Sequence, residues 1–382
     1  MNTHGRSLRS VVLTLVLAGL VVPILAGSAL TLRAAFGVLP AIGADQWSLA
    51  PMRAMVQQPG FATSLRLSLV TGMGSTLVAL ILALVLCAAM QARISTARAE
   101  HLLTPILATP HAAMAIGFAF LIAPSGWLVR LISPWATGWH TPPDLALVND
   151  SRGIALLFGL VIKELPFLIL VIHAALAQLP VGQQTAAGRA LGYGHGIAWA
   201  KIILPQLWPL IRLPVLVVQV FALSVVDMAV VLGPTNPPTL AVAVMRWFSH
   251  PDSAMLLQGS AGALTIALLA GGVIVVWLLA EALTRRVGLW WLRRGGRGLL
   301  AEPGLKLGRA AAFACLGLGL LALLVLLIWS LTWRWSFPNA LPESWSRKAW
   351  MTPGQNWGHP FGQSLLLALV TTSASVCLAI AW

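Results

Sequence analysis

Charged side chains are scarce in this chain: they make up 9% of its 382 residues, against about 25% in an average soluble protein. Acidic residues are the rarest, because ten Asp and Glu stand against 24 Lys and Arg, which gives a formal net charge of +14. Hydrophobic residues reach 58%. A nucleic-acid-binding protein carries its basic residues on a polar surface, but here they fill short gaps between long uncharged runs. The composition therefore excludes a soluble protein and predicts a polytopic membrane protein with no nucleic-acid partner.

Cysteine is also rare, and none of the three has the spacing of a metal site or a disulfide framework. Cys87, Cys315 and Cys377 each lie within an apolar run, so we expect them to be small buried hydrophobic residues. The eight His are scattered, and neither an HExxH nor a CxxC pattern occurs. We therefore expect no metal site, and the sequence argues against a metalloenzyme.

The sequence is rich in long uncharged stretches. A helix that crosses a bilayer needs about 20 mostly apolar residues. Such stretches occur at 11–32, 67–90, 102–123, 153–176, 213–232, 259–280, 310–332 and 362–382. The sequence therefore predicts an all-α, polytopic transmembrane helical bundle of about eight spans.

The distribution of basic residues predicts how the bundle is oriented. Basic residues in short loops favour the cytoplasm, and a cytoplasmic N-terminus places fourteen of the 24 Lys and Arg on that side. An alternative for the first span is a cleaved signal peptide, because Arg6 and Arg9 precede it and residues 26–29 are small; its uncharged length favours an uncleaved span. The Trp of the external loop are expected to be interfacial anchors: Trp333, Trp335, Trp345, Trp350 and Trp357.

The sequence repeats itself at an offset of 300 residues. This shift places the first span on 311–332 and gives nine identities in the 22 positions from Phe61 to Leu82. The alternative is a chance likeness of two Leu- and Val-rich helices, but the matched flanking residues favour a true duplication. We therefore expect a first membrane unit of six spans at 1–283, a basic cytoplasmic connector at 284–309, and the start of a second, truncated unit at 310–382.

The segment 178–209, between the fourth and fifth spans, is the longest non-spanning stretch with helical patterning. We expect one helix at 181–191, stopped by glycines, and a second at 197–204 that ends before Pro205. The first would expose small residues, which let another protein approach its backbone closely. The alternative is an ordinary amphipathic linker.

This segment resembles the EAA loop of the membrane subunits of bacterial ATP-binding-cassette importers. The pattern of that loop is Glu-Ala-Ala, three residues, Gly, nine residues, and Ile-x-Leu-Pro. Here the glycine, Ile, Leu and Pro match in type and spacing, whereas Ala186 replaces the Glu and Gly188 the second Ala. The resemblance implies that the loop docks in a cleft of an ATPase subunit through Ala186, Ala187, Gly188, Gly192, Ile202, Leu204 and Pro205.

The resemblance implies a function for the whole chain. Such permeases have a MetI-like fold, and the fused-duplicated permeases of thiamine and ferric-iron importers are the most similar. The chain would then form the path of a small solute through the bacterial inner membrane, with a P-loop ATPase dimer and a periplasmic solute-binding protein as partners. No lysine follows a glycine here, so there is no P-loop. We therefore expect ATP to be bound by the partner, and this chain to have no cofactor and no enzyme activity.

Three ionisable residues fall inside predicted spans: Lys163, Glu164 and Asp227. A charge in the bilayer core costs about 2.5–3.5 kcal/mol on insertion scales, so each needs an explanation. One is that they line the translocation path; the other is a structural role, as an ion pair or as polar contacts between helices. They also support the alternative function of an ion-coupled secondary transporter, since intramembrane acids and lysines relay protons.

Overall fold

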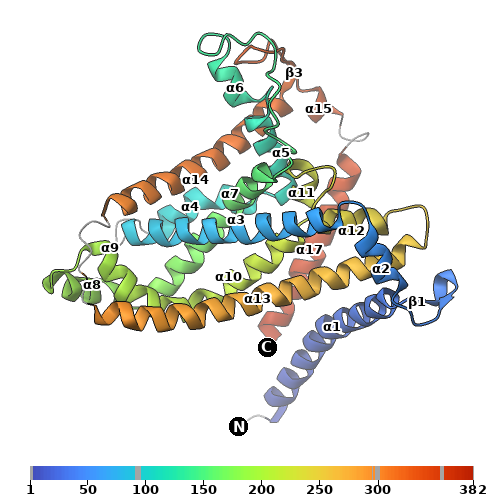
Figure 1. The fold of residues 1–382 in the computed structure, drawn as a ribbon, viewed down its shortest axis with the longest axis horizontal. Helices are drawn as coiled ribbons and strands as arrows, with labels where there is room; N and C mark the ends of the chain where they lie inside the picture. The colour runs from blue at the N-terminus through green and yellow to red at the C-terminus, as the bar shows by residue number, and fades with distance from the viewer. Residues whose placement is uncertain (1–2, 91–95, 295, 297–301, 353–356, 382) are drawn as a thin grey trace.

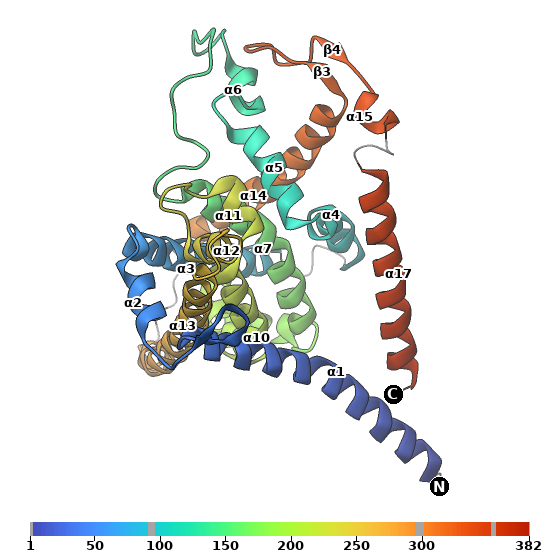
Figure 2. The ribbon, with the colours of Figure 1, turned by 90° about the vertical axis from the view of Figure 1, so that its right-hand side faces the viewer.

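The computed structural model describes residues 3–90, 96–294, 296, 302–352 and 357–381. It is an all-α bundle with two short hairpins, and eight of its helices are long and apolar enough to cross a membrane. Figure 1 shows most long helices lying side by side, with α1 outside the central group, and Figure 2 shows that α17 also stands apart from it. The predicted class and number of spans are confirmed, and two span boundaries are not.

The chain begins with a long helix, a hairpin and a second long helix. α1 (Thr3–Ala35) leads into β1 (Val38–Leu39) and β2 (Ala44–Asp45), which pair antiparallel around the short helix η1 (Pro40–Ile42). α2 (Ala50–Gln57) and α3 (Phe61–Met90) follow.

The most buried span is α7 (Ile154–Leu176), which has 67% of its most apolar window inside the bundle. It packs against α3 and α10 (Leu204–Ser224), and glycines allow α3 to approach both helices closely. A Cβ atom added to Gly74 would lie 2.8 Å from Leu157 of α7, and one added to Gly72 would lie 2.9 Å from Leu223 of α10. The core is therefore built where α3, α7 and α10 meet.

The third span is not the single helix predicted at 102–123. The chain forms α4 (Thr96–Ala108), breaks at Thr109 and Pro110, and continues as α5 (His111–Ile122) and α6 (Trp127–Ile132). Proline has no N–H to donate and disfavours helical geometry at the residue before it, which explains the break.

The fifth span differs from the prediction at both ends. α9 (His195–Ala198) passes through a π-helical turn, η2 (Trp199–Ile203), directly into α10. The second loop helix therefore does not end before Pro205, because the wider π-helical turn of η2 accommodates a proline, which has no N–H to donate. α10 ends at Ser224, and the remainder of the predicted span is a separate helix, α11 (Asp227–Leu232).

The sixth span belongs to a helix much longer than a bilayer is thick. α12 (Leu240–Phe248) precedes α13 (Met255–Arg293), whose 39 residues give a length of about 58 Å, against a bilayer core of about 30 Å. The predicted span at 259–280 is thus the middle of α13, which continues as an unbroken helix into the predicted connector.

The order of elements at the end of the chain repeats that at the beginning. α14 (Glu302–Ser330) is followed by a hairpin of β3 (Thr332–Arg334) and β4 (Ser344–Trp345), a short helix α15 (Lys348–Met351) and a long helix α17 (Gly358–Ala381). The series of long helix, hairpin, short helix and long helix is the same as from α1 to α3.

α14 packs on α3, α5 and α7 of the bundle formed by the preceding residues, with 28% of its most apolar window buried. A Cβ atom on Gly117 of α5 would lie 2.5 Å from the carbonyl oxygen of Ala322, so the two backbones nearly touch. By contrast, the most apolar windows of α1 and α17 are only 6% and 0% buried. Figure 2 shows both helices extending away from the central group.

Candidate coupling loop and intramembrane polar residues

The predicted helix–turn–helix loop lies at one end of the bundle (Figure 1). α8 (Val181–Ala190) begins after Pro180 and ends in a turn in which the N–H groups of Gly192 and Tyr193 donate to the carbonyls of Arg189 and Gly188. Gly192 has φ +81°, a left-handed conformation that favours glycine. The turn confirms the predicted role of glycine in stopping α8.

α8 is held against the start of the fifth span through Gly188. A Cβ atom there would lie 3.0 Å from Cδ1 of Ile202 and 3.1 Å from Cβ of Ala198. On the same side, the amides of Gln184 and Gln206 donate to each other at 3.1 Å. The glycine that departs from the EAA pattern is therefore the point where α8 packs most closely on its neighbours.

The loop is anchored to α3 by a histidine. Nε2 of His195, at the start of α9, donates to the carbonyl oxygen of Ala88 at 2.8 Å. Ala88 lies in the last turn of α3, where carbonyls have no partner within the helix. This hydrogen bond therefore links any movement of the loop directly to the end of α3.

A lysine anchors the same loop to α13. Lys201 is buried, and its Nζ donates to the carbonyl oxygen of Gly296 at 3.0 Å. Its ammonium group lies 5.2 Å from the ring centre of Tyr193 and 4.7 Å from that of Trp291. From the sequence, Lys201 was only one of the basic residues expected on the cytoplasmic side. A Tyr eight residues before it and a pair of Trp near the end of α13 were the features that could have indicated its contacts.

The seven predicted docking residues divide into an outer and an inner group. Ala186, Ala187, Gly192 and Pro205 are exposed, whereas Gly188 is buried and Ile202 and Leu204 are half-buried. Ala186 and Ala187 thus form a small apolar surface on α8. The inner residues hold the loop together instead of facing outward.

Lys163 does not pair with the neighbouring Glu164. Its Nζ donates to the carbonyl oxygens of Ile106, Leu107 and Thr109, at 2.6, 3.0 and 2.5 Å. These belong to the last turn of α4 and the break after it, where Pro110 leaves carbonyls without helical partners. A cation at a helix C-terminus is also favoured by the helix dipole. Lys163 therefore closes the end of α4.

The two acidic residues have different surroundings. Glu164 is 5% exposed, and neither carboxylate oxygen has a hydrogen-bond partner. Two other buried polar groups of the neighbouring helices also lack one: Oγ1 of Thr76 and Nε2 of Gln219. Asp227 is exposed instead, and its Oδ1 accepts from the N–H of Met228 at the start of α11. Lys163 and Asp227 therefore bind backbone groups of different segments, whereas Glu164 has no hydrogen-bond partner.

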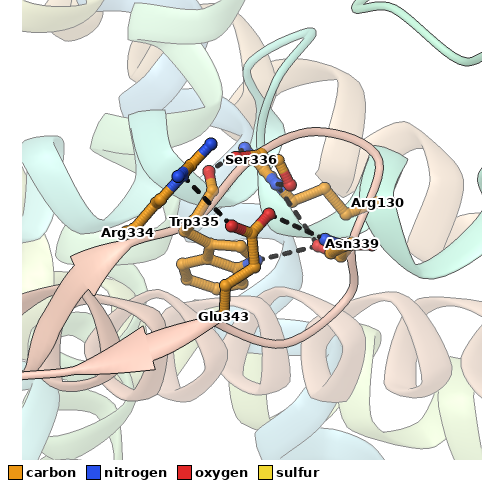
Figure 3. A network of polar contacts seen from close by, with 6 residues as sticks. All are labelled: Arg130, Arg334, Trp335, Ser336, Asn339 and Glu343. Carbon is orange, nitrogen blue, oxygen red and sulfur yellow. Dashed lines mark hydrogen bonds and ion pairs between the residues drawn. The ribbon is translucent and has the colours of Figure 1, made fainter.

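At the other end of the bundle a buried arginine joins α6 to the hairpin after α14 (Figure 3). Arg130 donates to the carbonyls of Trp335, Ser336 and Asn339 at 3.3, 2.8 and 3.2 Å, and its guanidinium lies 5.1 Å from the ring centre of Trp335. Glu343 accepts from Asn339 at 3.0 Å and pairs with Arg334 at 3.2 Å. Trp335 is therefore one of the contacts that hold this hairpin on α6, and not a membrane anchor as predicted.

The described part of the chain contains no group of three or more His, Cys, Asp or Glu arranged to hold a metal ion. Cys87 and Cys315 are partly buried, whereas Cys377 is exposed on α17. The expectation that all three are buried is wrong for Cys377, because α17 has few neighbours.

Comparison with known proteins gives one informative likeness. Over 251 residues, which are 65% of this chain and 46% of the relative, the sequence is 30% identical to the inner membrane ABC transporter permease protein YnjC of Escherichia coli (strain K12). The chain thus spans about half the length of this curated relative. No family model matches it. The described residues include eight helices that are long and apolar enough to cross a membrane. Together with these helices, the likeness supports a multi-pass protein of the inner membrane that is similar to an ABC transporter permease.

Proposed function

We propose that this chain is the permease subunit of an ATP-binding-cassette importer, which forms the path of a small solute and couples to a separate P-loop ATPase dimer through α8. The observation that carries the proposal is the geometry of the loop: a short helix with three exposed alanines, at one end of the bundle and anchored to α3, α10 and α13. The likeness to an ABC transporter permease supports it independently.

The anchors give the loop a mechanical role. Closure of the ATPase dimer would push α8, and the push would reach α3 through His195 and α13 through Lys201, while η2 continues directly into α10. Three spans would then tilt together and open the bundle to one side at a time. In this mechanism ATP is bound and hydrolysed by the partner, and a periplasmic binding protein delivers the solute.

The proposal includes a second unit that pairs with the first. The repeated order of elements and the identities at an offset of 300 support residues 310–381 as its beginning. The exposed apolar faces of α1 and α17 are the surfaces that such a unit would cover.

Glu164 is the predicted path residue that best fits a role in transport. Its carboxylate is buried without a partner, whereas Lys163 and Asp227 are engaged by backbone groups. Gln219 and Thr76 supply two more unpartnered polar groups on the helices that pack against α7. The same engagement of Lys163 and Asp227 gives no support to a proton relay through all three residues, so the secondary-transporter alternative is not favoured.

The test is binding of an ATPase subunit encoded beside this gene. We expect the two to copurify from membranes, and Ala187→Arg to reduce the bound ATPase by at least about tenfold, because a long cation is forced into a close-packed contact. Ala54→Arg is the matched control, since Ala54 is equally exposed on α2 at the opposite end of the bundle. Copurification that is unchanged by Ala187→Arg would refute docking through α8.

A further inference from the structure

The protein has a pocket of about 120 Å³ where the end of α2, the start of α3 and α12 meet. In Figure 1, α2 and α12 lie at the opposite end of the bundle from α8. The walls of the pocket come from residues within 58–64, 236–238 and 243–247. Because these segments are far apart in the sequence, no local pattern indicates the pocket. We call it the α12 pocket.

Close contacts between the segments hold the walls of the α12 pocket in place. Gly60 has φ +83°, and a Cβ atom there would lie 2.7 Å from Cβ of Pro237, so the turn before α3 lies directly against the loop before α12. The N–H of Leu240, at the start of α12, donates to Oγ of Ser68 on α3 at 2.8 Å. The pocket is therefore formed by segments that pack on one another.

Arg246 gives the α12 pocket a positive charge. Its guanidinium donates to the carbonyl oxygen of Thr235 at 2.9 Å, which uses one of five N–H groups and holds the side chain at the loop before α12. None of the described residues that line the pocket is acidic, and neither ion pair of the described structure includes Arg246. The charge therefore has no carboxylate partner within the part of the chain that the structure describes.

An amide pair at the α12 pocket has a hydrogen-bond donor in excess. Nε2 of Gln58, which lines the pocket, donates to Oε1 of Gln258 at 3.3 Å. Gln258 is 5% exposed, and its own Nε2 has no hydrogen-bond partner in the described structure. A buried donor without a partner is costly. The polar side of the pocket therefore favours a ligand that only accepts hydrogen bonds, as an ionised carboxylate does.

The remaining walls of the α12 pocket are apolar, and the room between them is small. Phe61 and Trp247 are half-buried, and Pro238 and Ala243 are buried. A cavity of about 150 Å³ holds benzene, which has six carbon atoms, so a volume of about 120 Å³ corresponds to about five non-hydrogen atoms. Propionate is a molecule of this size. Charge at one wall and rings at the others thus fit a carboxylate on a short hydrocarbon chain.

We propose that the α12 pocket binds a small free carboxylate, which pairs with the guanidinium of Arg246 and whose short hydrocarbon chain contacts Phe61 and Trp247. An arginine holds a carboxylate through two parallel hydrogen bonds. The volume accommodates the whole of such a molecule, so the assignment is to a free solute and not to the tip of a partner's side chain. A role as the first binding site of the imported solute rests on the proposed function, whereas the binding itself does not.

The test measures binding of propionate to the purified full chain in neutral detergent, by saturation-transfer NMR, which detects weak ligands. Propionamide is the matched neutral ligand, because it has nearly the same size and shape but no charge. We expect propionate to bind at least about tenfold more tightly than propionamide, and Arg246→Gln to remove most of this difference. Arg53→Gln is the control variant and should leave binding unchanged, since Arg53 is exposed on α2 at the same end of the bundle and does not line the pocket.

A second variant tests the volume of the pocket and not its charge. Ala243→Val should weaken propionate binding at least about threefold, because the added methyl groups occupy part of the space beside Arg246. Its thermal unfolding, compared with that of the unmodified chain, shows that the bundle is intact. Unchanged binding by a folded Ala243→Val would contradict a ligand inside the pocket.

Equal binding of propionate and propionamide by the unmodified chain would overturn the proposal, and this result needs no variant to fold. An equal loss in Arg53→Gln would overturn it too, because the effect would then follow from net charge alone. Inorganic phosphate that displaces propionate as well as propionate itself does would make the pocket a phosphate site. Glutamate blocked at both backbone ends carries the same group as propionate, so equally tight binding of it would overturn the assignment to a free solute. None of these measurements involves an ATPase, so their failure leaves coupling through α8 standing.

Discussion

Three buried cations of the described structure donate to backbone carbonyls, whereas the buried carboxylate of Glu164 has no hydrogen-bond partner. Lys163 closes the end of α4, Arg130 gathers carbonyls of the hairpin after α14, and Lys201 holds the carbonyl of Gly296. In each case the cation donates to carbonyl oxygens that have no partner within a helix. Sequence analysis found Lys163 from its position in an apolar run, but its partners lie 54 to 57 residues away and no local pattern indicates them.

We predict that Lys163→Met lowers the stability of the bundle by about 2–3 kcal/mol, because it leaves three buried carbonyls without a donor. The measurement is thermal unfolding of the purified chain in detergent. Lys348→Met is the control, since Lys348 is exposed on α15. If both variants unfold at the temperature of the unmodified chain, the proposal that Lys163 stabilises the end of α4 is wrong.

The contacts that hold the hairpin after α14 should weaken in acid. Hydrogen bonding by the Ser336 side chain, together with Arg334 and Asn339, lowers the pKa of Glu343 below its ordinary value of 4.5. A lowered pKa in the folded state means that the stabilisation is complete above the ordinary value and is lost as the pH falls through the lowered one. The difference in unfolding temperature between the unmodified chain and Glu343→Gln should therefore be present at about pH 6 and shrink as the pH falls below 4.5. A difference that is constant over this range would contradict the ionised pair.

At the scale of elements, periodicity and composition predicted the helices but not where proline breaks them. Pro110 ends a helix within the third span, whereas Pro205, Pro209 and Pro214 all lie within or at the start of α10. The difference depends on partners: the carbonyls freed at Pro110 are bound by Lys163, and η2 widens the helix just before Pro205. Such partners belong to the folded bundle and cannot be seen in a local window of sequence.

The packing of α8 provides a prediction with an internal control. Gly188→Val should destabilise the loop by about 1–3 kcal/mol, because the added methyl groups collide with Ile202 and Ala198. Gly182→Val, on the same helix, meets nothing within 4 Å and should cost far less. Limited proteolysis within 178–209 in membrane vesicles measures the effect. Equal cleavage of the two variants would show that α8 is not packed through Gly188.

At the scale of the whole molecule, the sequence predicted eight spans and a repeat, and the structure adds how the repeated part is placed. The helix that begins the second series, α14, packs on α3, α5 and α7 of the first bundle, whereas α1 packs mainly on α13 and α17 is 0% buried over its most apolar window. The shift of 300 residues indicates equivalent helices, but it says nothing about which unit each helix packs on. That choice depends on contacts between helices hundreds of residues apart.

The placement of α14 can be tested on two glycines of that helix. A Cβ atom on Gly319 would lie 2.9 Å from Ile162 and 3.1 Å from Ile106, whereas one on Gly317 meets nothing within 4 Å. We predict that Gly319→Val lowers stability by about 1–3 kcal/mol and Gly317→Val by much less. Thermal unfolding in detergent distinguishes them, and equal effects would show that α14 does not pack on α4 and α7.

The central claim, that α8 is the surface through which a separate ATPase drives this permease, is tested most directly by crosslinking. The three native cysteines are replaced by Ser, and a single cysteine is introduced as Ala187→Cys or, as control, Ala54→Cys, both at exposed positions. Membranes that contain the neighbouring ATPase are treated with a short thiol-to-amine crosslinker. The account predicts an ATPase adduct from Ala187→Cys and none from Ala54→Cys. Absence of the adduct at position 187 in a complex that still copurifies would contradict it.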